Sequence, residues 1–311
     1  MTPSARRLHL PFGGFQRIAV LRLSSLGDVV LTLPVVHALA RAYPRARLSY
    51  WVKEEYADVV QFDPAVSHVR RLERDARRLE DLVSMSAELE DADLIVDLHG
   101  NARTRVLTFR QKAPRLRAPS HRLARAALVH ARWLRYPPPP HALARFAAAL
   151  KPLEIAVPDA PRMTAGPEAE RRAELWMERW APPVRPVAML PGARHFTKRW
   201  PEESWIELHD RLSAAGRTLL YASLDAERAQ LPGLAARVAA TATARWCTEP
   251  LAILAAVLAR ASAAITSDSG LMHVAAARGL PVVALFGSTA PELGFAPAGE
   301  GHVVLCRHER C

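Results

Sequence analysis

The sequence predicts an α/β protein with two doubly wound, parallel-sheet domains. The chain has 311 residues, about twice the length of an ordinary domain. Short apolar runs alternate with longer amphipathic segments, a pattern typical of parallel sheets covered by helices on both faces. A passage with several prolines at 153–167 separates two such series, so we expect domains at residues 1–160 and 161–311.

The first series begins with the apolar run RIAVLRL, which predicts a buried strand at residues 17–23. DVVLTLPVVHALARAYP follows with apolar residues at a 3.6-residue period, which predicts a helix at 28–44 that is kinked at Pro34. The same reasoning predicts strands at 46–52, 66–72 and 92–100, and helices at 54–62, 77–91 and 121–134.

The second series repeats this alternation. It predicts helices at 168–180, 201–216, 225–240, 250–261 and 270–279, and strands at 186–192, 217–223, 262–268 and 281–287. Ligands of doubly wound sheets bind beyond the carboxyl ends of the strands, so polar residues that follow a strand are the candidate site residues.

The composition is that of a folded protein outside the membrane, with 50% hydrophobic and 23% charged residues. No apolar run is long enough to span a bilayer, and the N-terminal segment lacks the apolar core of a secretory signal, so we expect a cytoplasmic location. The three cysteines provide neither a disulfide framework nor a complete zinc site. We interpret Cys306 and Cys311 as free thiols; the alternative is the start of a metal or redox cluster.

The formal net charge of +11 is concentrated in one stretch. Residues 98–153 contain no Asp or Glu and twelve basic residues: Arg103, Arg105, Arg110, Lys112, Arg115, Arg117, Arg122, Arg125, Arg132, Arg135, Arg145 and Lys151. Such a stretch suits a polyanion, which leaves a nucleic acid, an anionic lipid surface and a phosphorylated substrate as possible partners.

The first strand is followed by SSLGD. Ser25 and Gly27 form a turn whose N–H groups suit an anion, and Asp28 falls in the first turn of the next helix. Ser25 and Asp28 also have the spacing of a capping box, which is the structural alternative for this pair. A dinucleotide-binding glycine fingerprint is absent from the chain.

The strand at 92–100 ends in the polar residues Asp97, His99 and Asn101. Residues of these types are also common in turns and caps. Because Arg103 and Arg105 follow directly, we give substrate contact and a structural role in the turn equal weight.

The strands of the second series are followed by residues whose hydrogen-bond donors suit a phosphate group. After the strand at 186–192, Gly192 permits a close backbone approach, and Arg194, Thr197 and Lys198 add donors and charge. After the strand at 262–268, a helix N-terminus suited to an anion is formed by Asp268, Ser269 and Gly270. Asp268 is alternatively an N-cap, and His273 is better interpreted as a packed or supporting imidazole than as a general base.

Four motifs together resemble one known family. RLSSLGDVVLTLPVVHALARAYP, DLHGNARTR, LPGARHFTKRWPEESW and SDSGLMHVAAARGLPVVALFGST are similar to segments of the bacterial lipopolysaccharide heptosyltransferases, glycosyltransferase family 9. The four segments occur in the family's order and span nearly the whole chain. Each is modest alone, and together they are specific.

This resemblance implies a GT-B fold, in which two Rossmann-like domains face each other across a cleft. The N-terminal domain is then expected to bind the acceptor and the C-terminal domain the nucleotide sugar. The implied reaction is an inverting, metal-independent transfer of heptose from ADP-L-glycero-D-manno-heptose to the lipopolysaccharide inner core. ADP-heptose is a substrate here, and no cofactor is expected.

The same resemblance implies roles for single residues. Asp28 matches the family's general base, Lys198 the residue that contacts the diphosphate or sugar, and Asp268 the residue that holds donor hydroxyls; Glu249 is a looser match for ribose binding. Asn101 and Arg103 are expected to face the phosphorylated lipid A/Kdo acceptor. We accordingly expect a monomer that contacts the anionic inner face of the inner membrane peripherally and binds no nucleic acid.

Two features depart from the family's pattern. GT-B chains usually end in a helix that returns to the first domain, whereas this sequence ends at CRHERC, and its acceptor half is unusually rich in arginine. Two alternatives therefore stay open. One is another GT-B enzyme, either a transferase with a different nucleotide sugar or a sugar-nucleotide epimerase. The other is a basic nucleic-acid-binding protein, although few aromatic residues are interleaved with the arginines to stack on bases.

Overall fold

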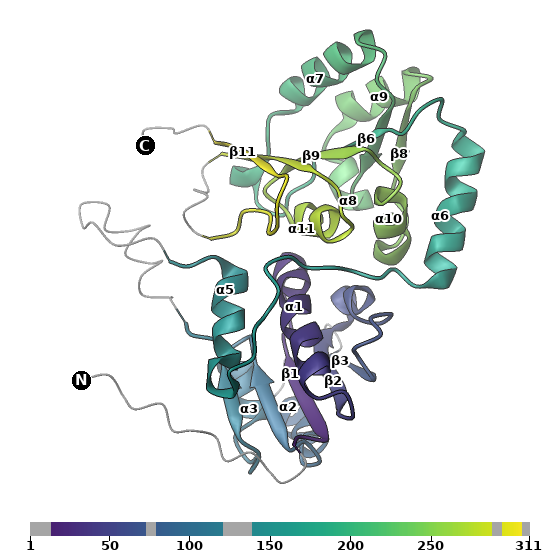
Figure 1. Ribbon diagram of the computed structural model, residues 1–311. Helices are drawn as coiled ribbons and strands as arrows, with labels where there is room; N and C mark the ends of the chain where they lie inside the picture. Colours follow the sequence, from purple (N-terminus) through teal and green to yellow (C-terminus); the bar gives the residue numbers. More distant parts are fainter. Residues whose placement is uncertain (1–13, 73–78, 121–138, 288–293, 307–311) are drawn as a thin grey trace, which may run out of the picture. The chain divides into compact units, whose positions relative to one another are not determined.

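The computed structural model of the chain describes residues 14–72, 79–120, 139–287 and 294–306 (Figure 1). The chain divides into two compact units, Met1–Pro161 and Arg162–Cys311, each with its own parallel sheet. The helix expected at 121–134 lies outside the described residues, as does Cys311. None of the described helices has the length and apolarity needed to cross a membrane.

The sheet of the first unit has five parallel strands in the order β3-β2-β1-β4-β5. The chain runs outward from β1 to β3 and then returns to the other side of β1, so its direction changes between β1 and β4. The elements in chain order are β1 (Arg17–Leu21), α1 (Leu26–Ala42), β2 (Arg47–Lys53), the 3-10 helix η1 (Glu54–Val59), β3 (His68–Leu72), α2 (Leu79–Ala87), β4 (Leu94–Asp97), α3 (Ala102–Leu107), β5 (Arg115–Arg117), α5 (Ala142–Ala147) and the 3-10 helix η2 (Ala148–Leu153).

Helices cover both faces of this sheet (Figure 1). On one face α1 packs against α5, and α1 is uninterrupted through the buried Pro34. On the other face, α2 and α3 close over an apolar cluster that includes Leu21, Trp51 and Ile95 from the strands. Burial of these side chains is the main source of stability for the unit, and it holds the strand ends at one edge.

The sheet of the second unit has six strands in the order β11-β10-β9-β6-β7-β8, and the chain's direction changes between β6 and β9. Trp205 of α7 and Leu234 of α9 pack on one face, and α10 and α11 lie on the other (Figure 1). The elements are α6 (Pro167–Trp180), β6 (Val187–Leu190), the 3-10 helix η3 (Phe196–Lys198), α7 (Glu202–Ala214), β7 (Leu219–Ala222), α8 (Asp225–Arg228), α9 (Pro232–Ala240), β8 (Ala244–Cys247), α10 (Leu251–Leu258), β9 (Ala263–Ser267), α11 (Gly270–Ala277), β10 (Val282–Phe286) and β11 (Val303–Cys306).

The sequence prediction joined two helices into one and missed the short helix α3 and three strands, and the helix expected at 54–62 is the 3-10 helix η1. The helix expected at 225–240 is two helices, because Pro232 cannot continue α8 and instead occupies the first turn of α9. The missed strands are β5, β8 and β11. They have three or four residues each, and the polar sequence RLR of β5 has no strand-like apolar pattern.

Candidate active site

In each unit, the predicted site residues flank the point where the strand order changes direction. In the first unit, the turn that holds Ser25, Gly27 and Asp28 follows β1, and the turn from His99 to Asn101 follows β4. In the second, the loop from Gly192 to Lys198 follows β6, and Asp268 follows β9. Diverging connections leave a crevice at such points, which is where doubly wound sheets bind ligands.

Asp28 is held by two neighbours that the chain places around it. Its Oδ2 atom lies 2.7 Å from Nη2 of Arg22 and accepts hydrogen bonds from Oγ and the backbone N–H of Ser25, at 2.9 and 3.3 Å. The other guanidinium arm donates from Nη1 to the carbonyl of Leu98 at 2.7 Å, and the ring of Phe146 packs against the guanidinium. Arg22 thereby joins the turns that follow β1 and β4.

The capping box predicted as the structural alternative for Ser25 and Asp28 is present at the start of α1. It does not use the whole carboxylate: among the described residues every side-chain contact of Asp28 is made by Oδ2, and the side chain is 16% exposed. Burial alone would raise the pKa of Asp28, but Arg22 and the hydrogen bonds from Ser25 outweigh it and hold the pKa below its ordinary value. Asp28 is therefore an ionised carboxylate with one oxygen left for a ligand.

The turn after β4 is ordered by the buried Asp97. Its Oδ1 atom accepts the N–H groups of His99 and Gly100, at 3.1 and 2.8 Å. Asn101 is the N-cap of α3, where its side chain accepts the N–H of Thr104 at 3.0 Å. Asp97 and Asn101 therefore have structural roles in this turn. The turn presents His99 at the same edge of the sheet as Asp28.

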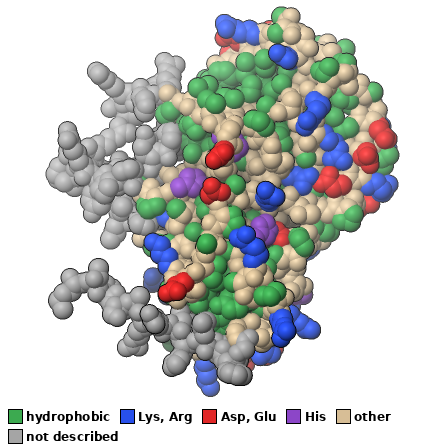
Figure 2. Space-filling view, viewed as in Figure 1, with side chains coloured by type: hydrophobic (Ala, Val, Ile, Leu, Met, Phe, Trp, Pro, Cys, Tyr) green, Lys and Arg blue, Asp and Glu red, His purple; other side chains and the backbone are tan. Residues whose placement is uncertain are grey.

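The basic stretch at 98–153 is not a single surface in the described part of the chain. Arg145 is buried, Arg115 donates to the carbonyl of Thr108, and Arg117 lies 3.4 Å from Asp97. The basic residues exposed or half-exposed on and just after α3 are Arg103, Arg105, Arg110 and Lys112. Figure 2 shows Lys and Arg side chains spread over both units on the face in view.

In the second unit, the predicted residues Lys198 and Asp268 are brought together. Nζ of Lys198 lies 2.7 Å from Oδ2 of Asp268, whose side chain is only 5% exposed. Oγ of Ser267 donates to the carbonyl of Pro191 at 3.2 Å and so ties the end of β9 to the end of β6. Gly287, at the end of β10, approaches the backbone oxygen of Thr197. Three strand ends therefore meet around the Lys198 loop.

The start of α11 has the predicted features of an anion site. Ser269 is its N-cap and Gly270 its first residue, so free N–H groups and the positive end of the helix dipole lie beside Asp268. The hydroxyl of Ser269 is buried and has no hydrogen-bond partner among the described residues. His273 is buried one turn further along, as expected for a packed imidazole.

The carboxylate of Glu227 lies close against Gly192, and no local sequence pattern indicates this contact. A Cβ atom on Gly192 would overlap the carboxylate of Glu227 in α8. Burial raises the pKa of Glu227, against the opposing effects of the Leu224 N–H and of Arg199. Arg199 also donates to the carbonyl of Ala193 at 2.8 Å, which braces the loop, whereas Arg194 and Thr197 are exposed. No local pattern links Glu227 to Gly192, because they are 35 positions apart and follow different strands.

Glu249 lies apart from these residues. It follows β8, the edge strand two positions from β6, and its Oε2 atom lies 3.1 Å from Nη2 of Arg172 in α6. Among the described residues, no group of three His, Cys, Asp or Glu side chains is arranged to hold a metal ion. Cys306 is a free cysteine in β11.

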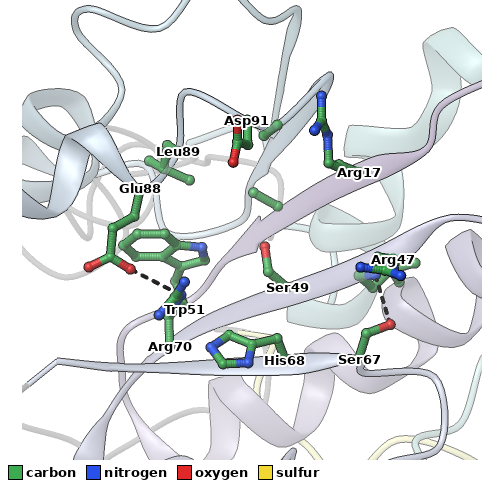
Figure 3. A pocket seen from close by; sticks show the side chains of 13 residues that line it. Arg17, Arg47, Ser49, Trp51, Ser67, His68, Arg70, Glu88, Leu89 and Asp91 are labelled. Atoms are coloured by element: carbon green, nitrogen blue, oxygen red, sulfur yellow. Dashed lines mark hydrogen bonds and ion pairs between the residues drawn. The ribbon is translucent and has the colours of Figure 1, made fainter.

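A hollow of about 440 Å³ in the first unit does not involve the predicted site (Figure 3). It lies over the amino-terminal halves of β1, β2 and β3, where Ala19 and Ser49 are too small to fill the space beside Trp51. Arg70 on its rim pairs with Glu88 at 3.0 Å (Figure 3). The hollow lies toward the opposite ends of the strands from Asp28.

Comparisons with known proteins agree with the motifs. The sequence profile of glycosyltransferase family 9 (heptosyltransferase) matches residues 84–311. Lipopolysaccharide heptosyltransferase 1 of Pseudomonas aeruginosa is 33% identical over 295 residues, covering 88% of this chain and 79% of that protein. This chain belongs to glycosyltransferase family 9.

Two solved structures show that the fold of this family 9 chain is shared. A family 9 glycosyltransferase from Veillonella parvula superposes with a TM-score of 0.79 at 24% identity, over 94% of this chain and 86% of that one. Escherichia coli heptosyltransferase WaaC with ADP gives a TM-score of 0.70 at 22% identity, over 94% and 93%. These matches confirm the predicted fold class of two parallel-sheet α/β units of the GT-B type.

Proposed function

We propose that this family 9 chain transfers heptose from ADP-L-glycero-D-manno-heptose to the lipopolysaccharide inner core, by a single inverting and metal-independent displacement. Two relatives support the substrates: one is a lipopolysaccharide heptosyltransferase, and one was solved with ADP. The observation that carries the proposal is the ionised carboxylate of Asp28 at the switch point of the first unit. In this proposal the first unit binds the acceptor and the second unit binds the donor.

Asp28 is proposed as the general base. The acceptor hydroxyl oxygen forms a bond to the anomeric carbon while the bond from that carbon to the diphosphate breaks, and the hydroxyl proton passes to Oδ1 of Asp28. Because its pKa is lowered, Asp28 is a weak base. A weak base suffices when the hydroxyl becomes acidic only as its oxygen bonds to the oxocarbenium-like carbon.

The donor side must stabilise the negative charge of the departing ADP. Lys198 is already fixed by Asp268, and the N-terminus of α11 adds free N–H groups together with the hydroxyl of Ser269. Fixed donors of this kind stabilise developing charge without reorganisation. We assign Gly192, Arg194, Thr197 and Gly270 to the same donor site, with His273 supporting α11 and Glu249 as the more distant ribose contact.

The acceptor side is assigned to the residues around Asp28. Ser25, Gly27, His99 and Asn101 lie at the switch-point edge, and Arg103 and Arg105 follow on α3. The positive charge of Arg103 and Arg105 suits the phosphorylated lipid A/Kdo acceptor. We propose that the protein works as a monomer in the cytoplasm, in peripheral contact with the inner face of the inner membrane.

The decisive experiment is mass analysis of the products formed from ADP-heptose and truncated lipopolysaccharides. The wild type is expected to add one heptose, and Asp28→Asn is expected to lose about 10²–10⁴-fold in turnover while it still binds ADP. Asp159→Asn, an exposed aspartate of the same unit, is the matched control and should keep turnover. Near-normal turnover by Asp28→Asn would leave only the capping role for this residue. Thermal stabilisation by UDP or GDP but not by ADP would contradict the donor assignment.

A further inference from the structure

The first unit carries an apolar groove that is open to solvent. It lies between α2 and α3, holds about 350 Å³, and is lined by Val83, Ser86, Arg105, Val106, Phe109 and Arg110. We call these six residues the α2–α3 surface. Phe109 is 81% exposed and Val83 is 42% exposed. Contiguous exposed apolar surface, such as a phenylalanine beside an apolar groove, often marks an interaction site, whereas a single exposed apolar residue does not.

The groove is held open by a buried polar contact. Oγ of Ser86 in α2 donates to the carbonyl of Leu107 at 2.9 Å, and Nε2 of Gln111 donates to the carbonyl of Ser86 at 2.6 Å. These hydrogen bonds fix α2 against the end of α3. Phe109 follows directly after α3, so the ring is presented outward by a braced segment.

The exposed positive charge of the groove comes from α3 and the residues that follow it. Arg105 and Arg110 are exposed, and neither side chain has an ion pair or hydrogen bond among the described residues. Lys112 is also exposed nearby in the sequence, and residues 98–153 contain no acidic side chain, whereas the sequence of α2 contains Glu80 and Asp81. Apolar side chains flanked by basic ones are the composition of surfaces that bind at the headgroup boundary of anionic bilayers.

We propose that the α2–α3 surface docks this protein on an anionic phospholipid bilayer. Phe109 and Val83 enter the boundary between headgroups and acyl chains, and Arg110 contacts lipid phosphates, while Arg105 stays with the acceptor. This docking role rests on the proposed function, because it concerns how the acceptor site reaches a membrane-anchored acceptor. α3 starts at the turn assigned to the acceptor and has six residues, so it is about 9 Å long. Docking at its far end would keep the site within reach of a sugar that is anchored in the membrane.

The test is binding of the full-length chain to phosphatidylcholine vesicles with and without phosphatidylglycerol. We expect binding only to the anionic vesicles, weakened by added salt. Phe109→Asp should reduce affinity about tenfold or more, since the ring then no longer enters the lipid. Phe196→Asp is the matched control for this readout, because Phe196 is 82% exposed on the other unit. It should bind vesicles like the wild type.

The electrostatic contribution is tested in the same assay. Arg110→Glu should reduce affinity for anionic vesicles about tenfold, and Arg245→Glu, which makes the same charge change on the second unit, should reduce it less than threefold. Equal effects of Phe109→Asp and Phe196→Asp, or of the two arginine variants, would overturn the proposal. So would binding of RNA in place of vesicles with the same dependence on Arg110.

An activity assay separates this inference from the proposed function. Phe109→Asp should retain wild-type turnover on a detergent-dispersed acceptor and lose it on the same acceptor embedded in vesicles. Thermal unfolding of Phe109→Asp and Phe109→Ser checks that both variants fold. Vesicle binding that depends on Phe109, without heptose transfer to any acceptor, would refute the proposed function and leave the docking surface standing. Heptose transfer by the wild type, with no effect of Phe109→Asp on vesicle binding, would refute the docking surface and leave the proposed function standing.

Discussion

Nη2 of Arg22 lies 2.7 Å from Oδ2 of Asp28, and Nη1 of the same side chain lies 2.7 Å from the carbonyl oxygen of Leu98. One guanidinium thus connects the carboxylate after β1 to the turn after β4, across the point where the strand order changes. It orients the carboxylate and keeps it ionised. Arg22 is a positioning residue for the base that we propose.

Arg22→Gln should shift the pH dependence of turnover. Without the guanidinium, burial acts on the Asp28 carboxyl with less opposition, so the pKa of Asp28 rises and the acid limb of the rate profile moves to higher pH. The measurement is kcat against pH. Arg41→Gln, an exposed arginine late in α1, is the control and should leave the profile unchanged. An unmoved acid limb in Arg22→Gln would mean that Arg22 only stabilises the fold.

Lys198→Ala should weaken ADP binding about 10- to 100-fold, since one charge-assisted contact to the diphosphate is lost. Isothermal titration with ADP measures the change, and Lys198→Arg should recover most of the affinity. Lys151→Ala removes an exposed lysine of the first unit and serves as the matched control. If Lys198→Ala bound ADP like the wild type, the pairing of Lys198 with Asp268 would be structural.

Gly192→Ala should destabilise the second unit by only about 1 kcal/mol, because the new methyl group displaces the flexible end of Glu227 from its hydrogen bond with the Leu224 N–H. In a Glu227→Ala background the same substitution should cost little, because the carboxylate is already absent, and thermal unfolding can measure both losses. Among the described residues, a Cβ atom at Gly287 would meet only the backbone oxygen of Thr197, at 3.6 Å. Gly287→Ala is therefore the control and should unfold like the wild type. An equal loss in the Glu227→Ala background would rule out this displacement as the cause.

His209 should make stability depend on pH. It is buried between Tyr221 and Thr241, at 3.1 Å from the Tyr221 hydroxyl and 2.9 Å from Oγ1 of Thr241. Burial lowers the pKa of His209, with Arg237 acting in the same direction and Asp210 opposing it. As pH falls below about 6.5, this histidine becomes protonated in the unfolded chain but stays neutral in the folded chain. The free energy of unfolding therefore decreases with falling pH, until the pH passes the lowered pKa of the folded state.

Melting temperatures between pH 7.5 and pH 5 measure this effect, in steps of about half a unit. His209→Gln should flatten the decrease, because its amide does not titrate. His68→Gln changes an exposed histidine of the first unit and should keep the wild-type dependence. The same slope in wild type and His209→Gln would show that other groups cause the loss.

Much of the fold could be predicted because long alternating segments carry their own signal. The apolar runs at β1, β6, β9 and β10 are bounded by turn residues, and the helices between them have a clear period. β5 and β8 lack such runs, and the run of β11, VVLC, alternates between exposed and half-buried side chains. They form because a neighbouring strand offers hydrogen bonds at the edge of each sheet, as β4 does for Arg115 to Arg117, and a window of local sequence does not contain that neighbour.

The sequence by itself determined which residues end the strands, and thereby the candidate residues Asp28, Lys198 and Asp268, since the change from an apolar run to polar turn residues is a local property. Only the tertiary structure decided which strand ends are neighbours, and so which side chains meet. Arg22 reaches Asp28 and the turn after β4 because β1 and β4 are paired, and Glu227 meets Gly192 because β6 and β7 are paired. Such pairings depend on packing that joins segments up to 76 residues apart, and that packing is a property of the whole sheet.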